Sequence, residues 1–219
     1  MIDIALIKES LPLLLRGTLV TLKVAGCATF IGISLGTAFG LILTRKNRIF
    51  RALVTVFITI IRGTPMLIQI FIAAYMPPQL GIHLSLFWAA TLAIGLNSSA
   101  YVSQIVKSGI NSVGSGQTEA ARVLGFTPFQ TIYYIIFPQA FRVIVPALGN
   151  ELITLIKDSS LASVIGVVEL TKAGSIIRST TYDAVSIFTV VALIYLVLTS
   201  LLSLLVSQLE ARTSRYVKN

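Results

Sequence analysis

The chain has 219 residues, of which 55% are hydrophobic and only 11% are charged. Since an average soluble domain carries about 25% charged residues, this chain has too little polar surface to coat a soluble globule, and lipid must cover much of it. The net charge of +9 does not indicate a nucleic-acid partner, because the basic residues concentrate in short loops beside apolar segments.

Five apolar stretches are long enough to cross a membrane as helices, because a crossing needs about 20 residues. We expect them at residues 19–44, 53–75, 84–106, 144–168 and 184–206. Residues 1–18 are predicted to form an amphipathic segment in the membrane interface, and residues 208–219 form a basic tail. The fold class expected from this pattern is an all-α membrane protein with a transmembrane domain over residues 19–207.

Loop charges orient the predicted spans. The loop after the first span carries Arg45, Lys46, Arg48 and Arg51 without an acid, whereas residues 77–83 carry no Lys or Arg. The loop at 169–183 is neutral, and the C-terminal tail is basic again. Because basic residues mark cytoplasmic loops, we expect the N-terminus outside and the C-terminus in the cytoplasm.

Three glycines recur at four-residue spacing in the first span, at Gly32, Gly36 and Gly40. This spacing places them on one helix face, where a second backbone can approach closely. Packing within the chain is the favoured interpretation, and dimerisation is the alternative.

The connection at 110–138 is too polar for a span and contains the signals of two short helices. Gly114 opens the first helix, and Glu119 is expected in its first turn, where the helix dipole favours an acid. Gly125 is placed to end that helix as the residue after its C-cap. The first helix is therefore expected to be short and independently capped.

The second helix begins at a recognisable cap. Thr127 is the predicted N-cap, Pro128 occupies the first helical position, and Gln130 completes a capping box. Pro138 is expected to stop this helix. A capped helix pair that protrudes from a bundle is typical of a docking element.

The same connection resembles the EAA signature of ABC-importer permeases, in which EAA is followed after three residues by G, after nine by I, and after one more by L-P. The positions that fit this spacing are Glu119, Ala120, Ala121, Gly125, Ile135 and Pro138, with Phe137 where Leu is usual. The resemblance implies a type I ABC-importer permease fold. It further implies that Glu119, Ala120, Ala121 and Gly125 couple the chain to an ATPase.

Four further strings are similar to the polar amino-acid uptake subfamily of these permeases. They are Arg62-Gly63-Thr64-Pro65 with Gln69, then 97–101 (NSSAY), 148–151 (LGNE) and 157–161 (KDSSL). Residues 103–110 depart from the subfamily pattern, since Gln104 stands where an acid is usual. The resemblance implies a permease for polar amino acids in the bacterial inner membrane.

The partners implied by the resemblance are an ABC ATPase dimer, a second permease subunit that is identical or similar, and a periplasmic or lipid-anchored solute-binding protein. The sequence contains no GK dipeptide, so no phosphate-binding loop of the Walker type is present. ATP and Mg²⁺ are therefore expected on the ATPase, with no cofactor on this chain. The single His83 and single Cys27 predict no metal cluster.

Polar residues within the predicted spans are costly and usually face a cavity or a partner. Glu151, Thr154 and Asp158 share one helix face, and Asn97, Tyr101 and Gln104 form a similar stripe. Carboxylates suit the ammonium or guanidinium group of an amino acid, and an arginine or amide suits its carboxylate. The hypothesis is a substrate path lined by Asn97, Tyr101, Glu151, Asp158, Arg62 and Gln69, with a lean toward basic amino acids and glutamine next.

Three alternatives stay open. Arg62 or Lys157 could neutralise Glu151 or Asp158 as a structural ion pair, or Arg62 with the Gly-Thr-Pro that follows could hold a kink in the second span. The chain could also be a proton-coupled secondary carrier that uses Glu151 and Asp158. Five spans without an inverted repeat make a poor stand-alone carrier.

Overall fold

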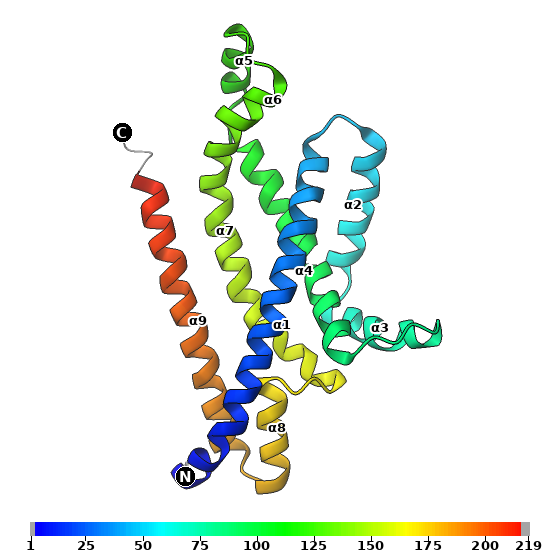
Figure 1. The fold of residues 1–219 in the computed structure, drawn as a ribbon, viewed down its shortest axis with the longest axis vertical. Helices are drawn as coiled ribbons and strands as arrows, with labels where there is room; N and C mark the ends of the chain where they lie inside the picture. The colour runs from blue at the N-terminus through cyan, green and yellow to red at the C-terminus, as the bar shows by residue number, and fades with distance from the viewer. Residues whose placement is uncertain (1–2, 216–219) are drawn as a thin grey trace.

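The computed structural model describes residues 3–215, excepting the side chains of Ile4 and of 212–215, and this part of the chain is helical without strands. Its long helices form an elongated bundle with the two described ends of the chain at opposite ends (Figure 1). The predicted basic tail falls partly outside the described residues, because 216–219, including Lys218, are not among them.

The first helix is longer than expected. α1 runs without a break over Ile4–Thr44, so no boundary separates residues 1–18 from the first span. Asp3 caps it by accepting hydrogen bonds from the N–H groups of Ala5 (2.9 Å) and Leu6 (3.1 Å). Residues 5–18 are not a separate interfacial segment, because Leu14 is fully buried in one core cluster with residues of α8 (Leu170–Thr181) and α9 (Ala184–Arg215).

The glycine stripe packs within the chain, as expected. Gly32, Gly36 and Gly40 face α4 (Leu86–Asn111), and α1 and α4 form the most extensive helix–helix contact of the bundle. A Cβ on Gly36 would lie 2.5 Å from the Cβ of Val102 and 2.8 Å from the carbonyl oxygen of Ser99. The two backbones therefore approach too closely for any side chain.

The second predicted span is broken. Residues 53–75 divide between α2 (Arg48–Gly63) and α3 (Met66–Gln79), which meet at an angle of 104°. The break falls at Thr64 and Pro65, because the residue before a proline is disfavoured in the helical region and Thr64 is extended. The expected kink after Arg62 is confirmed, in the stronger form of a broken helix.

The connection forms the expected first helix, α5 (Ser115–Val123), which Gly125 leaves at a φ of +80°. Glu119 is the fifth residue of α5 and lies beyond its first turn, so that detail of the prediction was wrong. The capping box of Thr127 and Gln130 is confirmed at the start of α6 (Pro128–Gln130).

Pro138 does not stop the second helix. α6 continues through a π-helical segment, η1 (Thr131–Ile136), into α7 (Phe137–Asp158). The N–H of Phe137 bonds the carbonyl of Ile132, five residues earlier. Proline has no N–H group to donate to the hydrogen-bond ladder of an α-helix. The π turn before Pro138 changes the spacing of these backbone hydrogen bonds, and the helix continues past the proline.

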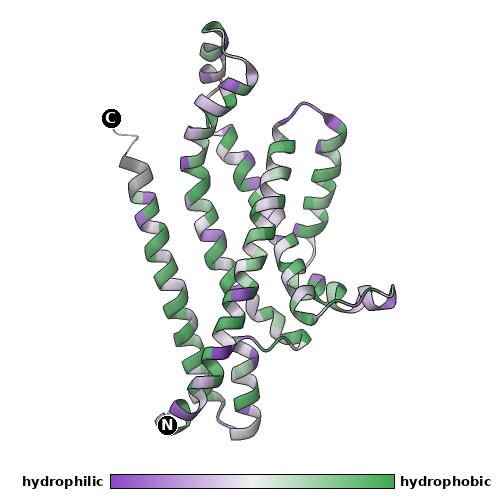
Figure 2. Cartoon of the chain, viewed as in Figure 1, coloured by the Kyte–Doolittle hydropathy of each residue, from purple (hydrophilic) through white to green (hydrophobic). Residues whose placement is uncertain are grey.

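The fourth span ends in a 3₁₀ segment, η2 (Ser159–Ile165), and Gly166 turns the chain at a φ of +100°. The region 169–183, expected as a loop, contains the helix α8. The last helix, α9, begins at Ala184 as predicted and continues beyond 206. Hydrophilic residues gather at the ends of the bundle, while the long helices are mostly hydrophobic along their length (Figure 2).

Among the residues that the structure describes, three helices are long and apolar enough to cross a membrane, namely those at Ala5–Thr44, Pro128–Ile165 and Ala184–Ala211, and the bent pair α2–α3 is a fourth candidate. α4 is not among them, although it has 26 residues. Its inner surface carries small and polar side chains such as Thr91, Ser98 and Ser103, which neighbouring helices bury. Small and polar residues are typical of helix interfaces inside membrane bundles.

Candidate functional site

A polar cluster surrounds the break between α2 and α3. The Gln69 Nε2 donates to the carbonyl of Ile61 (2.7 Å) and to the Thr64 carbonyl (3.1 Å) and Oγ1 (2.8 Å). Gln69 therefore satisfies carbonyl groups that lose their partners where the α2 ladder ends. One predicted path residue thus stabilises the broken helix.

The same cluster reaches α4. The Asn97 Nδ2 donates to the Oε1 of Gln69 at 3.0 Å, and Asn97 is only 5% exposed. The Arg62 guanidinium lies over the ring of Tyr101, with its Cζ 5.1 Å from the ring centroid. Such a contact favours a cation held against the electron-rich face of an aromatic ring. Four of the six predicted path residues are therefore brought together at one break.

Glu151 lies on α7 and forms a hydrogen bond to α4 outside this cluster. The Ser98 Oγ donates to its Oε1 at 2.7 Å. Ser98 follows Asn97 directly in α4, so Glu151 and the Asn97–Gln69 cluster are bonded to neighbouring residues of one helix, with no hydrogen bond between them in the described part of the chain. A short hydroxyl–carboxylate bond holds the carboxylate and leaves further acceptor positions for a ligand.

Asp158 is the last residue of α7 and is half-buried, seven positions beyond Glu151. That separation is about 10 Å along a helix. Thr154, between them, donates its hydroxyl back to the carbonyl of Asn150 (3.1 Å). The carboxyl groups of Glu151 and Asp158 therefore occupy separate positions along α7. The Thr154 hydroxyl is used in a hydrogen bond within the helix.

The structure shows no direct contact of the kind that the ion-pair alternative requires. Within residues 3–215, neither Arg62 nor Lys157 forms an ion pair of 4 Å or less with Glu151 or Asp158, although the charge of Lys157 acts on the adjacent carboxyl group of Asp158. Arg62 contacts Tyr101, and Glu151 accepts from a neutral hydroxyl.

The EAA residues occupy the part of the chain that projects from the bundle, where α5 and α6 extend beyond the ends of the long helices (Figure 1). Ala121 is buried, whereas Glu119 and Ala120 are exposed. Large apolar side chains are exposed beside them, with Val123 87% and Phe129 75% accessible. Exposed apolar residues on a projecting element are typical of a surface that contacts another protein or the membrane.

Sequence reasoning missed Glu169, which is fully buried at the N-cap of α8. Its carboxylate accepts hydrogen bonds from the N–H groups of Thr171 (2.9 Å) and Lys172 (2.8 Å), and from the hydroxyls of Tyr195 (2.9 Å) and Thr21 (3.4 Å). Burial raises the pKa of Glu169, and these hydrogen bonds oppose the rise. The signal available in the sequence was an acid three residues before Lys172 at a possible helix start.

Replacing Glu169 with alanine is expected to lower the free energy of unfolding by about 2–4 kcal/mol, because a helix cap is lost and the hydroxyls of buried Thr21 and partly buried Tyr195 lose this acceptor. Tyr195→Phe removes the hydrogen bonds that the Tyr195 hydroxyl forms with Glu169 (2.9 Å) and with Thr171 (3.1 Å), and should cost about 1–2 kcal/mol. Glu9→Ala, at an exposed glutamate of α1, is the control and should change stability by less than about 0.5 kcal/mol. Thermal unfolding in detergent measures all three, and equal midpoints would contradict the role of Glu169.

Comparison with known proteins supports the resemblance seen in the sequence. Residues 28–215 match the family described as binding-protein-dependent transport system inner membrane component. The chain is 39% identical over 200 residues to GlnP of Rickettsia bellii, a permease named for glutamine transport, covering 91% of this chain and 92% of that one. It is 35% identical over 212 residues to the arginine transport system permease protein ArtQ of Bacillus subtilis, and the match covers 96% of this chain and 97% of ArtQ.

A solved structure has the same fold. A chain in the crystal structure of an amino acid ABC transporter with histidines is 38% identical and superposes with a TM-score of 0.91, over 97% of this chain and 99% of that chain. The expected resemblance to permease subunits of amino-acid ABC importers, with their type I fold, is confirmed. On the matched residues 28–215, the chain belongs to the family of binding-protein-dependent transport system inner membrane components.

Proposed function

We propose that the chain is the transmembrane permease subunit of an ATP-driven importer for polar amino acids. The observation that supports this most directly is the projecting α5–α6 pair, which carries the EAA spacing and exposes apolar side chains at one end of the bundle. A surface of this kind needs a protein partner. An ATPase dimer docked there would transmit its closure to α4 and α7, between which the pair is inserted.

The substrate is proposed to pass the polar residues of α2–α4 and α7. Asn97, Tyr101, Arg62 and Gln69 lie at the break in the second span, and Glu151 and Asp158 follow along α7. Two carboxylates in this path favour a ligand with a cationic group. Relatives are named for glutamine and for arginine, and we propose basic amino acids first and glutamine second.

The proposed topology has five spans, with α4 as the crossing enclosed by the others. The turn at 45–47, the α5–α6 pair and the C-terminal end of α9 lie at one end of the bundle, and the N-terminal end of α1 lies at the other (Figure 1). Since the basic loops belong to the first group, the positive-inside rule places that end in the cytoplasm of the bacterial inner membrane.

The decisive experiment is reconstitution of the permease in liposomes with an ABC ATPase subunit, a second permease copy or sister subunit, and a solute-binding protein. ATP hydrolysis should rise when the binding protein is loaded with one of a panel of amino acids, and should not rise with the empty binding protein. Uptake that follows a proton gradient without ATP would instead support the carrier alternative, in which Glu151 and Asp158 relay protons.

The docking assignment has its own test. Glu119→Lys reverses an exposed charge on α5 and is expected to lower the ATPase recovered with the permease about tenfold or more, equivalent to at least 1.4 kcal/mol. Glu9→Lys, the same reversal at the other end of the bundle, should leave recovery unchanged. Equal recovery and equal transport for both variants would remove Glu119 from the docking surface.

A further inference from the structure

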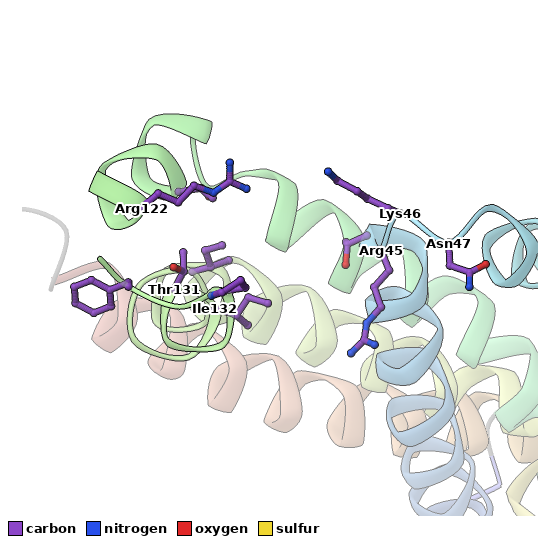
Figure 3. Close-up of a pocket in the computed structure, with 11 residues that line it drawn as sticks. Arg45, Lys46, Asn47, Arg122, Thr131 and Ile132 are labelled. Carbon is purple, nitrogen blue, oxygen red and sulfur yellow. The ribbon is translucent and has the colours of Figure 1, made fainter. Parts of the chain in front are cut away.

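A pocket of about 640 Å³ lies at the proposed cytoplasmic end of the bundle, between the turn that joins α1 to α2 and the base of the α5–α6 pair (Figure 3). One wall carries Arg45 and Lys46 from the turn, and Arg122 reaches it from α5. In the close-up, Lys46 extends toward the side of the pocket that carries Arg122, and Arg45 points down along α1 (Figure 3).

The pocket is positively charged, and its basic side chains have no acidic partner among the described residues. Its lining includes three basic side chains and no acidic one. Within residues 3–215, Arg45, Lys46 and Arg122 have neither an ion-pair nor a hydrogen-bond partner for their side chains. The positive-inside rule accounts for basic residues at this end. It does not account for basic residues from two elements far apart in the sequence lining the same pocket.

The opposite wall is apolar. It is lined by Phe126, Ile132 and Ile136. The side chain of Ile132 is 53% exposed. Ile132 and Ile136 belong to η1, which is part of the long apolar helix at Pro128–Ile165. A molecule with its charged group among the basic residues would therefore have its apolar part beside a membrane-crossing helix.

We propose that this pocket binds the phosphate of an anionic phospholipid headgroup, with the first part of an acyl chain against Ile132 and Ile136. The proposal rests on the orientation given under the proposed function, which places the pocket at the cytoplasmic leaflet. Arginine guanidinium groups match phosphate oxygens in a two-bond geometry. Basic pockets between membrane helices on the cytoplasmic side are suited to such headgroups.

The combination of walls distinguishes a lipid from the other anions that could enter. A free phosphate would use the basic wall and gain nothing from the isoleucines. An acidic loop of the ATPase would use Arg122, which lies on the docking helix α5, but has no reason to fill a hollow that reaches down to η1. Only an amphiphile satisfies both walls at once.

The test titrates the purified full-length chain in neutral detergent with dioctanoyl phosphatidylglycerol, and counts bound lipid by native mass spectrometry. Arg45→Gln combined with Arg122→Gln should weaken binding about 20-fold, since each basic residue near a lipid headgroup contributes about fivefold. Arg48→Gln combined with Arg51→Gln removes the same charge from the neighbouring surface of α2, outside this pocket. That control should change binding less than twofold.

Two further ligands separate the sources of the phosphate. Dioctanoyl phosphatidylcholine, which has no net charge, and glycerol 3-phosphate, which has no acyl chain, should each bind at least tenfold more weakly than phosphatidylglycerol. Ile132→Ser should weaken phosphatidylglycerol binding and leave glycerol 3-phosphate binding unchanged. Arg122→Lys keeps the charge, and its near-normal binding would show that the glutamine variants act through charge rather than through misfolding.

Equal losses from the two double variants would overturn the proposal in favour of general surface charge. Equal affinity for glycerol 3-phosphate would overturn the lipid assignment. Reduced recovery of the ATPase with unchanged lipid binding in the Arg45→Gln, Arg122→Gln variant would assign the pocket to the ATPase. Because lipid binding is measured without ATP, substrate or partner subunits, its outcome does not depend on whether the transport assignment holds.

Discussion

Replacement of Gly36 by leucine is expected to prevent the chain from folding. At this position α1 and α4 approach so closely that even a Cβ would lie 2.8 Å from the backbone oxygen of Ser99. The neighbouring atom is backbone and cannot rotate away, so the helices must separate. The expected cost is about 3 kcal/mol or more, at the upper end for overpacked sites. Separation would also expose the small polar residues of α4, which its neighbours bury.

Gly26 on the same helix supplies the matched control, because a Cβ there meets no atom within 4 Å. Gly26→Leu should yield as much monodisperse protein as the native chain, whereas Gly36→Leu should yield little or none by size-exclusion chromatography. A folded, fully helical Gly36→Leu chain that has lost only its self-association would show that the stripe serves dimerisation. That outcome would contradict the packing of α1 on α4.

The sequence was informative wherever a local rule determines the structure. The capping box of Thr127 and Gln130 and the left-handed Gly125 are confirmed, because each depends on residues within one turn of the chain. The packing predicted for the glycine stripe is also confirmed, because small residues at four-residue spacing form a helix face on which another backbone can approach closely. Hydropathy located the apolar segments and missed their true ends by several residues.

The errors share a different cause, which is tertiary context. Pro138 stops an isolated helix, but a π turn before it lets the helix continue into α7. The region of α8 was expected as a loop between two spans. It is a helix whose N-cap, Glu169, accepts hydrogen bonds from Thr21 on α1 and Tyr195 on α9. No local sequence pattern predicts that Thr21, 148 residues earlier, and Tyr195, 26 residues later, will both donate to this carboxylate.

In the candidate site, too, the sequence predicted the individual residues, and the tertiary structure determined how they contact one another. Asn97 and Gln69 were singled out as separate polar residues in separate spans, and the structure joins them by a hydrogen bond of 3.0 Å. The sequence alone could not predict that Gln69 would also donate to a carbonyl group near the end of α2, because that contact depends on the 104° bend between α2 and α3. Arg62 proved to contact an aromatic ring rather than a carboxylate.

Replacement of Glu151 by glutamine is the sharpest test of the proposed substrate path. Glutamine has nearly the same shape, and its carbonyl oxygen can still accept the hydrogen bond that the Ser98 hydroxyl donates at 2.7 Å. Folding and assembly should therefore be kept while the negative charge is lost. If Glu151 binds the cationic group of a basic amino acid, uptake of arginine should fall about tenfold to a hundredfold, because a hydrogen bond to a charged group contributes about 1.5–3 kcal/mol.

Two control variants isolate the charge. Ser98→Ala removes the hydrogen bond and keeps the carboxylate, so arginine uptake should change less than it does in Glu151→Gln. Thr154→Val alters the same helix at a hydroxyl that bonds its own backbone, and it should transport normally. Glutamine uptake should be affected little in any of the three, since glutamine has no cationic side chain for a carboxylate at this position to hold.

The pattern of loss identifies the role of Glu151. A selective loss of arginine uptake, with ATP hydrolysis still stimulated by a loaded binding protein, would place the carboxylate in contact with the side chain of the substrate. An equal loss for arginine and glutamine would indicate contact with the α-ammonium group, which both carry. Unchanged uptake of both, in a chain that assembles normally, would remove Glu151 from the path and leave its bond to Ser98 as a structural link between α4 and α7.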